Sequence, residues 1–175
     1  MSEPRILDLS AGNRAMWYDK NCPLATFVDI RPEMKPDIVA DSRNLQSTVG
    51  EGYDLVVFDP PHTNFSKNSD MAKTYGYLTG PEIVRLVKET AREAYRVTSY
   101  GAFLIFKWND RDRSLKSVLE MLEPYWMPLF GQISATRRRR SGSDKMSSTY
   151  WITLVRRDDP IDILGDALVA REDKK

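Results

Sequence analysis

Tyr53-Asp54-Leu55-Val56-Val57-Phe58-Asp59-Pro60-Pro61-His62 is a mostly apolar run that stops abruptly at an acid and two prolines. Its first six residues are typical of a strand buried within a sheet that is covered on both faces. Proline donates no backbone hydrogen bond and has a locked φ angle, so the end of this run predicts a rigid rim. Such a rim can hold an amino group.

Short apolar runs on both sides of this stretch predict six more strands, with two helical patterns among them. The strands are expected at residues 5–9, 24–28, 37–39, 101–106, 127–133 and 149–155. Thr79 and Glu82 have the spacing of a capping box, and Pro124 ends a second helix that begins near Asp110. This order predicts an α/β fold: a Rossmann-like, seven-stranded, mostly parallel sheet with a terminal antiparallel hairpin and helices on both faces.

Length and composition limit the class of protein. The 175 residues suit one domain over residues 1–157, with a short helix at 161–170 and a charged tail making up residues 158–175. A net charge of +1 means that affinity for nucleic acid must come from a local basic patch. The single cysteine, Cys22, excludes an internal disulfide, and no apolar run approaches the ~20 residues that span a bilayer. We therefore expect a cytoplasmic protein without a membrane segment.

Small or acidic residues follow four strands at the ends where a parallel sheet binds ligands. Ser10-Ala11-Gly12-Asn13 follows the first strand and predicts a turn that presents backbone amides. Asp29 follows the second strand, where an acid can accept hydrogen bonds from a ribose diol. Asp41 and Asp59 follow the next two. Each acid alone would more often cap a helix, but their common register favours one ligand-binding crevice.

The stretch Asp59-Pro60-Pro61-His62 resembles the Asp-Pro-Pro-Tyr signature of S-adenosylmethionine-dependent methyltransferases that modify exocyclic nitrogens of nucleic-acid bases. His62 stands where that family usually has an aromatic residue. The order and spacing of residues 5–156 also look like those of a class I methyltransferase core. One departure lies in the first turn, where members commonly have two or three glycines and this chain has Gly12 followed by Asn13-Arg14.

Residues 7–20, 59–62 and 106–109 are similar to small methyltransferases often encoded in phage and prophage genomes. The resemblance implies S-adenosylmethionine as the cofactor. The residues that it implies for cofactor binding are Asp8, Leu9, Ser10, Ala11 and Gly12 beside the methionine part, Asp29 on the ribose, Asp41 with Ser42 near the adenine, and Asp59 near the transferred methyl group.

Methyl transfer to such an amine requires alignment and charge stabilisation, because the sulfonium methyl group is already electrophilic. Hydrogen bonds from the amine to the Asp59 carboxylate and the Pro60 carbonyl stabilise the positive charge that grows on nitrogen. His62, after Pro61, either stacks on the target base or takes up the proton after transfer. Asp59, Pro60, Pro61 and His62 are thus the expected catalytic group, and neither a metal nor a cysteine nucleophile is needed.

Four consecutive arginines, Arg137, Arg138, Arg139 and Arg140, lie in the predicted loop between the last two strands and favour phosphate binding. Lys107 and Trp108, after the fifth strand, are further candidates for substrate contact, although core packing or a solvated lysine would also explain them. The polar segment 63–77 is either a lid or a long surface loop. No stretch is long enough for a separate recognition region, so a homodimer or a second recognition subunit is a further expectation.

Three functions follow from these residues. The favoured one is methylation of an exocyclic amino nitrogen of a nucleic-acid base in DNA or RNA, adenine N6 ahead of cytosine N4. The alternative is methylation of a small-molecule or protein amine, with the arginines binding an acidic substrate. The third is a scaffold protein that binds the cofactor without transferring its methyl group.

Overall fold

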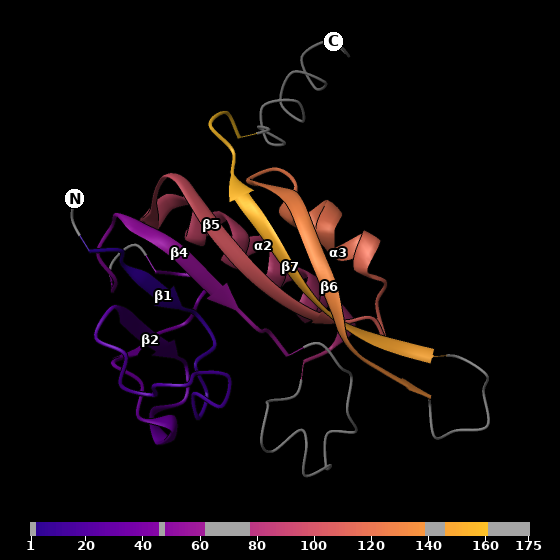
Figure 1. Ribbon diagram of the computed structural model, residues 1–175, viewed down its shortest axis with the longest axis horizontal. Helices are drawn as coiled ribbons and strands as arrows, with labels where there is room; N and C mark the ends of the chain where they lie inside the picture. The colour runs from indigo at the N-terminus through magenta and orange to yellow at the C-terminus, as the bar shows by residue number, and fades with distance from the viewer. Residues whose placement is uncertain (1–2, 46–47, 62–77, 139–145, 161–175) are drawn as a thin grey trace, which may run out of the picture.

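The computed structural model describes residues 3–45, 48–61, 78–138 and 146–160 (Figure 1). The strands are β1 (Ile6–Asp8), β2 (Ala25–Asp29), β3 (Ile38–Val39), β4 (Tyr53–Phe58), β5 (Thr98–Asn109), β6 (Trp126–Arg138) and β7 (Met146–Arg156). The helices are the short 3-10 helix η1 (Pro32–Met34), α2 (Gly80–Val97) and α3 (Leu115–Leu122). The helix predicted at 161–170 and the polar segment 63–77, predicted as a lid or a surface loop, lie outside the described residues.

All seven strands form one sheet in the order β3-β2-β1-β4-β5-β7-β6. The first five strands along the chain pair in parallel, and β7 is antiparallel to both of its neighbours, β5 and β6. The predicted mostly parallel sheet with a terminal antiparallel hairpin is thus confirmed. Strand order reverses between β1 and β4, so the crevice favoured for ligands in such sheets lies at their carboxyl ends.

Several boundaries differ from the prediction because contacts between distant residues extend the strands. β5 reaches Asn109, and the next residue, Asp110, accepts a hydrogen bond from the backbone N–H of Ser148 at 2.7 Å. This contact holds the chain against β7, so α3 begins at Leu115 rather than near Asp110. Ser114 caps the helix, its hydroxyl accepting from the N–H of Ser117 at 3.3 Å.

The core lies between the sheet and α2. The capping box predicted from Thr79 and Glu82 is present at the start of α2. Ile83, Val87 and Ala91 of this helix are buried against apolar side chains of the sheet. A hydrogen bond also joins α2 to the hairpin: the indole N–H of Trp126 in β6 donates to the Ala91 carbonyl at 2.9 Å.

The two described α-helices, α2 and α3, lie behind the sheet in the view of Figure 1. The connections between β1 and β4 are built from turns and η1 instead of long helices. The sequence predicted helices on both faces of the sheet. Within the described part of the chain, α-helices cover one face only. None of the described helices is long and apolar enough to cross a membrane.

Candidate functional site

A pocket of about 690 Å³ opens at the carboxyl ends of the parallel strands. This volume is in the range of small-molecule sites. Its wall includes the turn after β1, the acids after β2 and β3, and the Asp59-Pro60-Pro61 rim after β4. Lys107 of β5 and Leu86 of α2 complete the wall. The sheet topology therefore brings the predicted strand ends together at one crevice.

The turn after β1 has a backbone shape that depends on Gly12 and Arg14. Gly12 has a φ of +50°, and Arg14 has a φ of +57°, a left-handed conformation that is uncommon for a side chain larger than glycine. Hydrogen bonds offset the cost of this conformation: the Arg14 guanidinium donates to the Lys20 carbonyl at 2.6 Å and to the Asp37 carboxylate at 3.0 Å. It also lies 3.9 Å above the ring of Phe27. A tethered arginine thus holds a position whose backbone conformation favours glycine.

Asp8 lies beneath the pocket and is not part of its wall. Its side chain is 0% exposed and accepts hydrogen bonds from the Trp17 indole at 2.7 Å and the Ser10 N–H at 3.1 Å. Burial raises the pKa of Asp8 to about 6, the two hydrogen bonds oppose this rise, and the Asp59 and Asp29 carboxylates add to it. Asp8 therefore acts on the turn that lines the pocket and not on its interior.

Asp29 closes the pocket wall after β2 and is already held by several donors. It accepts from the Gly12 N–H at 2.8 Å and from the Arg31 guanidinium at 2.9 and 3.1 Å. Burial by itself would raise the pKa of Asp29, but hydrogen bonds from Arg31 and Gly12 lower it below its ordinary value. The Arg31 backbone N–H also donates to Asp29 at 2.9 Å, so each carboxylate oxygen already accepts two hydrogen bonds, and a ligand hydroxyl would have to share or replace one of these donors.

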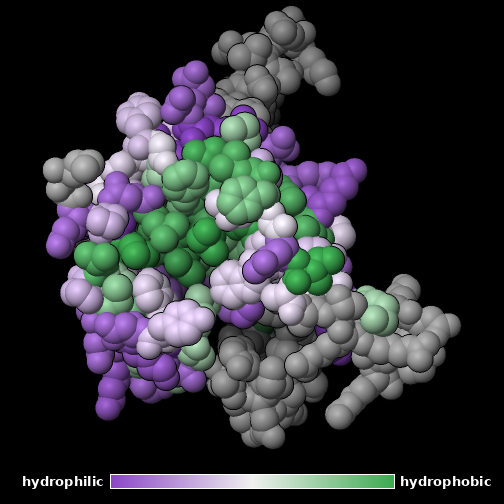
Figure 2. All heavy atoms as spheres, viewed as in Figure 1, coloured by the Kyte–Doolittle hydropathy of each residue, from purple (hydrophilic) through white to green (hydrophobic). Residues whose placement is uncertain are grey.

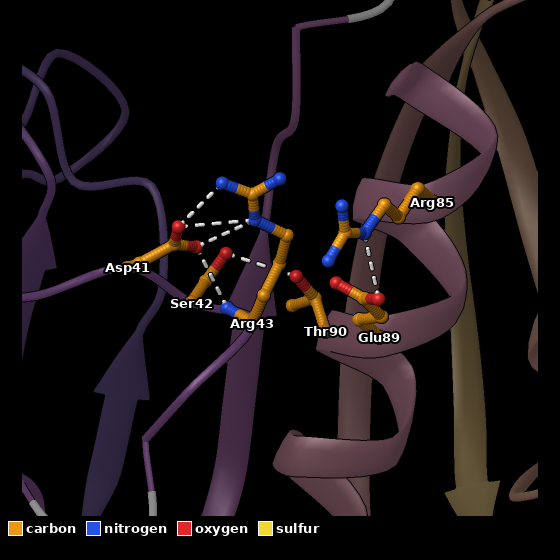
Figure 3. A network of polar contacts seen from close by, with 6 residues as sticks. All are labelled: Asp41, Ser42, Arg43, Arg85, Glu89 and Thr90. Atoms are coloured by element: carbon orange, nitrogen blue, oxygen red, sulfur yellow. Dashed lines mark hydrogen bonds and ion pairs between the residues drawn. The ribbon is translucent and has the colours of Figure 1, made fainter. Parts of the chain in front are cut away.

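Asp41, which follows β3, pairs with Arg43 as Asp29 pairs with Arg31 (Figure 3). Its carboxylate accepts from the Arg43 guanidinium at 2.5 Å, and this hydrogen bond lowers the pKa of Asp41. Ser42 points toward α2, where its hydroxyl lies 2.9 Å from the hydroxyl of Thr90. The buried contact fixes the loop, so Asp41 and Arg43 stay at the pocket edge while Ser42 anchors them.

Asp59 is held at the end of β4 by groups from two neighbouring strands. Its backbone N–H donates to the Ser10 hydroxyl at 2.8 Å, and its carboxylate accepts from the Lys107 ammonium at 2.5 Å. The ammonium also lies 5.5 Å from the ring of Trp151. The site therefore has a carboxylate with an internal counter-charge, on a proline-rich rim that keeps its backbone in place.

Other predicted residues are not brought to the pocket. Trp108 is 0% exposed, stacks on Phe106 and donates to the Arg113 carbonyl at 2.9 Å, so the prediction that it contacts substrate is replaced by a place in the core. Alternation along β5 puts Trp108 on the sheet face opposite Lys107. His62, Arg139 and Arg140 lie outside the described residues.

The backbones of Arg137 and Arg138 form the end of β6, paired with Ser147 and Met146 of β7. This segment was predicted as loop, and the structure shows a strand up to Arg138. Within the described part of the chain, no group of three or more His, Cys, Asp or Glu side chains could hold a metal ion.

Arg31 and Arg43 are site residues that the sequence analysis missed. Each stands two positions after a strand-end acid, in the repeated pattern Asp29-x-Arg31 and Asp41-x-Arg43. That repeat is a readable signal for an acid fixed by its own arginine. Ile30 and Leu86 also line the pocket, and they provide the apolar wall that a purely polar search of the strand ends overlooks.

Neither a family model nor a curated protein matches this chain in sequence. Solved structures do match it in fold. The N-methyltransferase NodS from Bradyrhizobium japonicum WM9, in complex with S-adenosyl-L-homocysteine, aligns with a TM-score of 0.56 at 13% identity over 89% of this chain and 79% of that one.

Two further structures match with comparable scores. TrmN from Thermus thermophilus gives a TM-score of 0.55 at 13% identity, over 88% of this chain and 44% of that one. The 16S rRNA (adenine(1408)-N(1))-methyltransferase from Catenulisporales acidiphilia gives 0.51 at 13% identity, over 90% of both chains. At these identities the likeness concerns the fold, and the chain has the Rossmann-like fold found in these methyltransferases.

Proposed function

We propose that the protein is an S-adenosylmethionine-dependent methyltransferase that acts on an exocyclic amino nitrogen of a nucleic-acid base, with adenine N6 favoured over cytosine N4. The observation that carries this proposal is the Asp59-Pro60 rim in the pocket wall, with Lys107 paired to Asp59 at 2.5 Å. Structures of the same fold include methyltransferases, one in complex with S-adenosyl-L-homocysteine and one that acts on an adenine of rRNA.

The residues around the pocket suit this cofactor. Asp29 lies in the pocket wall after β2, where a ribose hydroxyl would share this carboxylate with Gly12 and Arg31. Ile30 and Leu86 offer apolar contacts for a flat base, and the turn at Ser10-Ala11-Gly12 lies where the methionine part would fit. When bound, the cofactor supplies an electrophilic methyl group, which leaves alignment and charge stabilisation to the protein.

Asp59 and Pro60 orient the target amine in the proposed reaction. The amine donates to the Asp59 carboxylate and the Pro60 carbonyl, which turns its lone pair toward the methyl group. With the cofactor bound, its methyl group would pass from the sulfonium sulfur to this nitrogen, where positive charge would develop. The negative end of the Asp59 side chain stabilises this charge until the nitrogen loses its proton, to water or to His62.

The Lys107 pairing favours a nucleobase amine over an alkylamine. An alkylamine with a pKa near that of lysine, about 10.4, is protonated at neutral pH. Such a cation gains little from a carboxylate that already has an ammonium group 2.5 Å away, and that ammonium repels it. An exocyclic base amine is neutral and needs only an acceptor. Methylation of a small-molecule or protein amine therefore remains the second candidate.

The test is labelled methyl transfer from the cofactor to DNA, RNA, protein and metabolite fractions, followed by identification of the modified nucleoside. We expect label in a nucleic-acid fraction. The Asp59→Ala variant should lose roughly 100-fold or more of this transfer while still binding the cofactor in calorimetry. Label only in protein or metabolites would select the second candidate, and cofactor binding without any transfer would select the scaffold.

The sequence also bears on the partner. The arginine run at 137–140 is the chain's strongest basic cluster, and the proposal includes phosphate binding by this run beside the crevice. A homodimer or a recognition subunit would add selectivity for the nucleic acid, and the proposal includes such a partner.

A further inference from the structure

Asp29 is the acid that the proposed cofactor site offers to a ribose, and the protein itself already fills its acceptor positions. An ionised carboxylate has about four such positions, two on each oxygen. Oδ1 accepts from the backbone N–H of Arg31 and from the Arg31 Nε, both at 2.9 Å. Oδ2 accepts from the Gly12 N–H at 2.8 Å and from the Arg31 Nη2 at 3.1 Å. A ribose diol therefore donates two full hydrogen bonds to Asp29 only if one donor leaves each oxygen.

The four donors differ in how readily they can leave. The Gly12 N–H belongs to a turn that is held to β2, because the Ala11 N–H donates to the Val28 carbonyl at 3.1 Å. The backbone of Arg31 is held as well, since its carbonyl accepts from the Met34 N–H at 3.1 Å. The Nε and Nη2 groups of Arg31, here called the Arg31 fork, are instead carried by rotatable side-chain bonds. The fork is the donor that can leave without a change in the backbone.

The contacts of the Arg31 fork match those of a vicinal diol. The fork gives one hydrogen bond to each oxygen of Asp29, from Nε to Oδ1 and from Nη2 to Oδ2. Two neighbouring ribose hydroxyls that bind one carboxylate also give one hydrogen bond to each oxygen. When the fork leaves, the two backbone donors stay and keep Asp29 in place. The fork and the diol thus compete for the same two acceptor positions.

The surroundings of Arg31 allow its guanidinium to leave Asp29. The Arg31 side chain is 26% exposed, whereas that of Asp29 is 5% exposed. Figure 2 shows mostly hydrophilic residues around β2, in contrast to the hydrophobic middle of the sheet. Arg31 also lines the pocket, and its Nη2 lies 3.7 Å from the position that a Cβ at Gly12 would take. Departure of the guanidinium therefore exposes it to water and opens the pocket between Asp29 and the Gly12 turn.

The second acid of the pocket, Asp41, does not impose the same condition. Its side chain is 31% exposed, and that of its partner Arg43 is 32% exposed. Water competes for such a carboxylate and screens the ion pair, so displacement of Arg43 costs less. Asp29 is the acid at which the arginine partner matters most.

We propose that Arg31 sets the affinity of the pocket for a ribose diol: the Arg31 fork occupies the acceptor positions on Asp29 that the diol needs, and a nucleoside must displace it to bind there. This inference rests on the proposed function, because it takes the pocket to bind a cofactor that contains a ribose. It adds to that function a residue that opposes cofactor binding.

Binding of adenosine and 2′-deoxyadenosine tests the competition, because the second nucleoside lacks one hydroxyl of the diol. The measured quantity is the ratio of their Kd values in NMR titrations of the wild type and of Arg31→Met, whose side chain donates no hydrogen bond. We expect the preference for adenosine to be roughly tenfold larger in Arg31→Met, which corresponds to about one hydrogen bond to a charged group. Equal preferences in the two proteins would overturn the proposal.

Two further variants separate the fork from its charge. Lys35→Met removes an exposed cation that is not part of the pocket wall and should keep the wild-type preference. Arg31→Lys keeps the charge, but a single ammonium nitrogen does not reproduce the two-pronged contact, so the preference should rise roughly threefold or more. A wild-type preference in Arg31→Lys, or a rise in Lys35→Met equal to that in Arg31→Met, would assign the effect to charge and overturn the proposal.

A second measurement uses the wild-type protein and so does not depend on how a variant folds. S-Adenosyl-L-homocysteine is added, and exchange of the Arg31 Nε–H with water is followed by NMR, the signal being the one that Arg31→Lys lacks. The exchange should accelerate on the order of tenfold when the ligand binds, because the Nε–H then loses its bond to a buried carboxylate. Unchanged exchange at saturation would contradict the displacement of the fork.

Failure of the proposed function would look different from failure of this inference. If neither S-adenosyl-L-homocysteine nor adenosine binds the wild type or Arg31→Met, the cofactor assignment is overturned, and the inference with it. If both ligands bind but the adenosine preference is the same in the two proteins, only the role of Arg31 is overturned.

Discussion

Lys107 is the residue on which substrate choice depends in the proposed site. Its ammonium neutralises Asp59 at 2.5 Å, and both side chains line the pocket. Replacing it with methionine removes this ammonium from beside the Asp59 carboxylate, which increases the attraction of the site for protonated amines. The sequence placed Lys107 at a strand end, but its pairing with a residue 48 positions earlier is a product of the parallel β4–β5 contact.

We therefore expect Lys107→Met to change selectivity. The ratio of kcat/KM for an alkylamine to that for the nucleic-acid substrate should rise roughly tenfold, which corresponds to about 1.4 kcal/mol. The control is Lys107→Arg, which keeps the positive charge and should keep the ratio within about threefold. An unchanged ratio in Lys107→Met would remove Lys107 from the account of specificity.

Asp8 makes stability depend on pH at the residue scale. Burial raises its pKa from 3.8 in the unfolded chain to about 6 in the folded protein. Between these values the folded protein retains a proton that the unfolded chain has lost, so the contribution of Asp8 to stability falls as pH rises. A shift of this size corresponds to roughly 3 kcal/mol.

The comparison with Asp8→Asn isolates this contribution, because asparagine does not titrate. Without cofactor, the free energy of unfolding of the wild type minus that of the variant should decrease by roughly 2.4 kcal/mol from pH 4 to pH 7. Most of the change should fall below about pH 6. Urea denaturation at intervals of pH measures it, and a constant difference would contradict the buried-charge explanation.

At the scale of single elements, α2 shows how local chemistry places a helix beside the pocket. The Glu82 carboxylate accepts from the Thr79 N–H at 2.7 Å, and the Thr79 hydroxyl accepts from the Glu82 N–H at 3.4 Å. Both residues lie within one turn, so this start was predictable from the sequence. The start of α3 was not, because Asp110 is bound by Ser148 of a strand 38 residues later.

Thr79→Ala is expected to destabilise the protein by about 1 kcal/mol, since an alanine cap leaves backbone N–H groups of the first turn without an acceptor. The urea midpoint of unfolding measures this loss. Thr79→Ser retains the hydroxyl and should lose only a few tenths of a kcal/mol. If serine and alanine destabilise equally, the hydroxyl is not the source of the stability.

For the whole molecule, charge predicts how nucleic acid would bind. The net charge is only +1, so attraction to a phosphate backbone must be local, and the arginine run is the candidate. The arginine run is evident in the sequence. That β6 pairs with β7 as far as Arg138 was visible only in the structure.

Binding of single-stranded nucleic acid should weaken steeply with salt, because phosphate contacts release counterions. Replacing Arg139 and Arg140 by glutamine should reduce the slope of log K against log salt by about 1.4, from two contacts at about 0.7 each. The control replaces Lys88 and Lys116, which are exposed on α2 and α3, by glutamine, and so removes the same amount of charge elsewhere on the protein. An equal reduction in that control would show that general charge, not the arginine run, drives binding.

The sequence by itself determined the strands, the hairpin, the start of α2 and the acids at the strand ends, because each depends on residues that are near one another along the chain. Only the tertiary structure decided which partners those acids have. Asp59 pairs with Lys107 across two strands, Asp8 lies beneath the pocket instead of in its wall, and Trp108 packs in the core. Strand order and face determine these outcomes, and both arise from pairing between segments far apart in sequence, which local patterns do not encode.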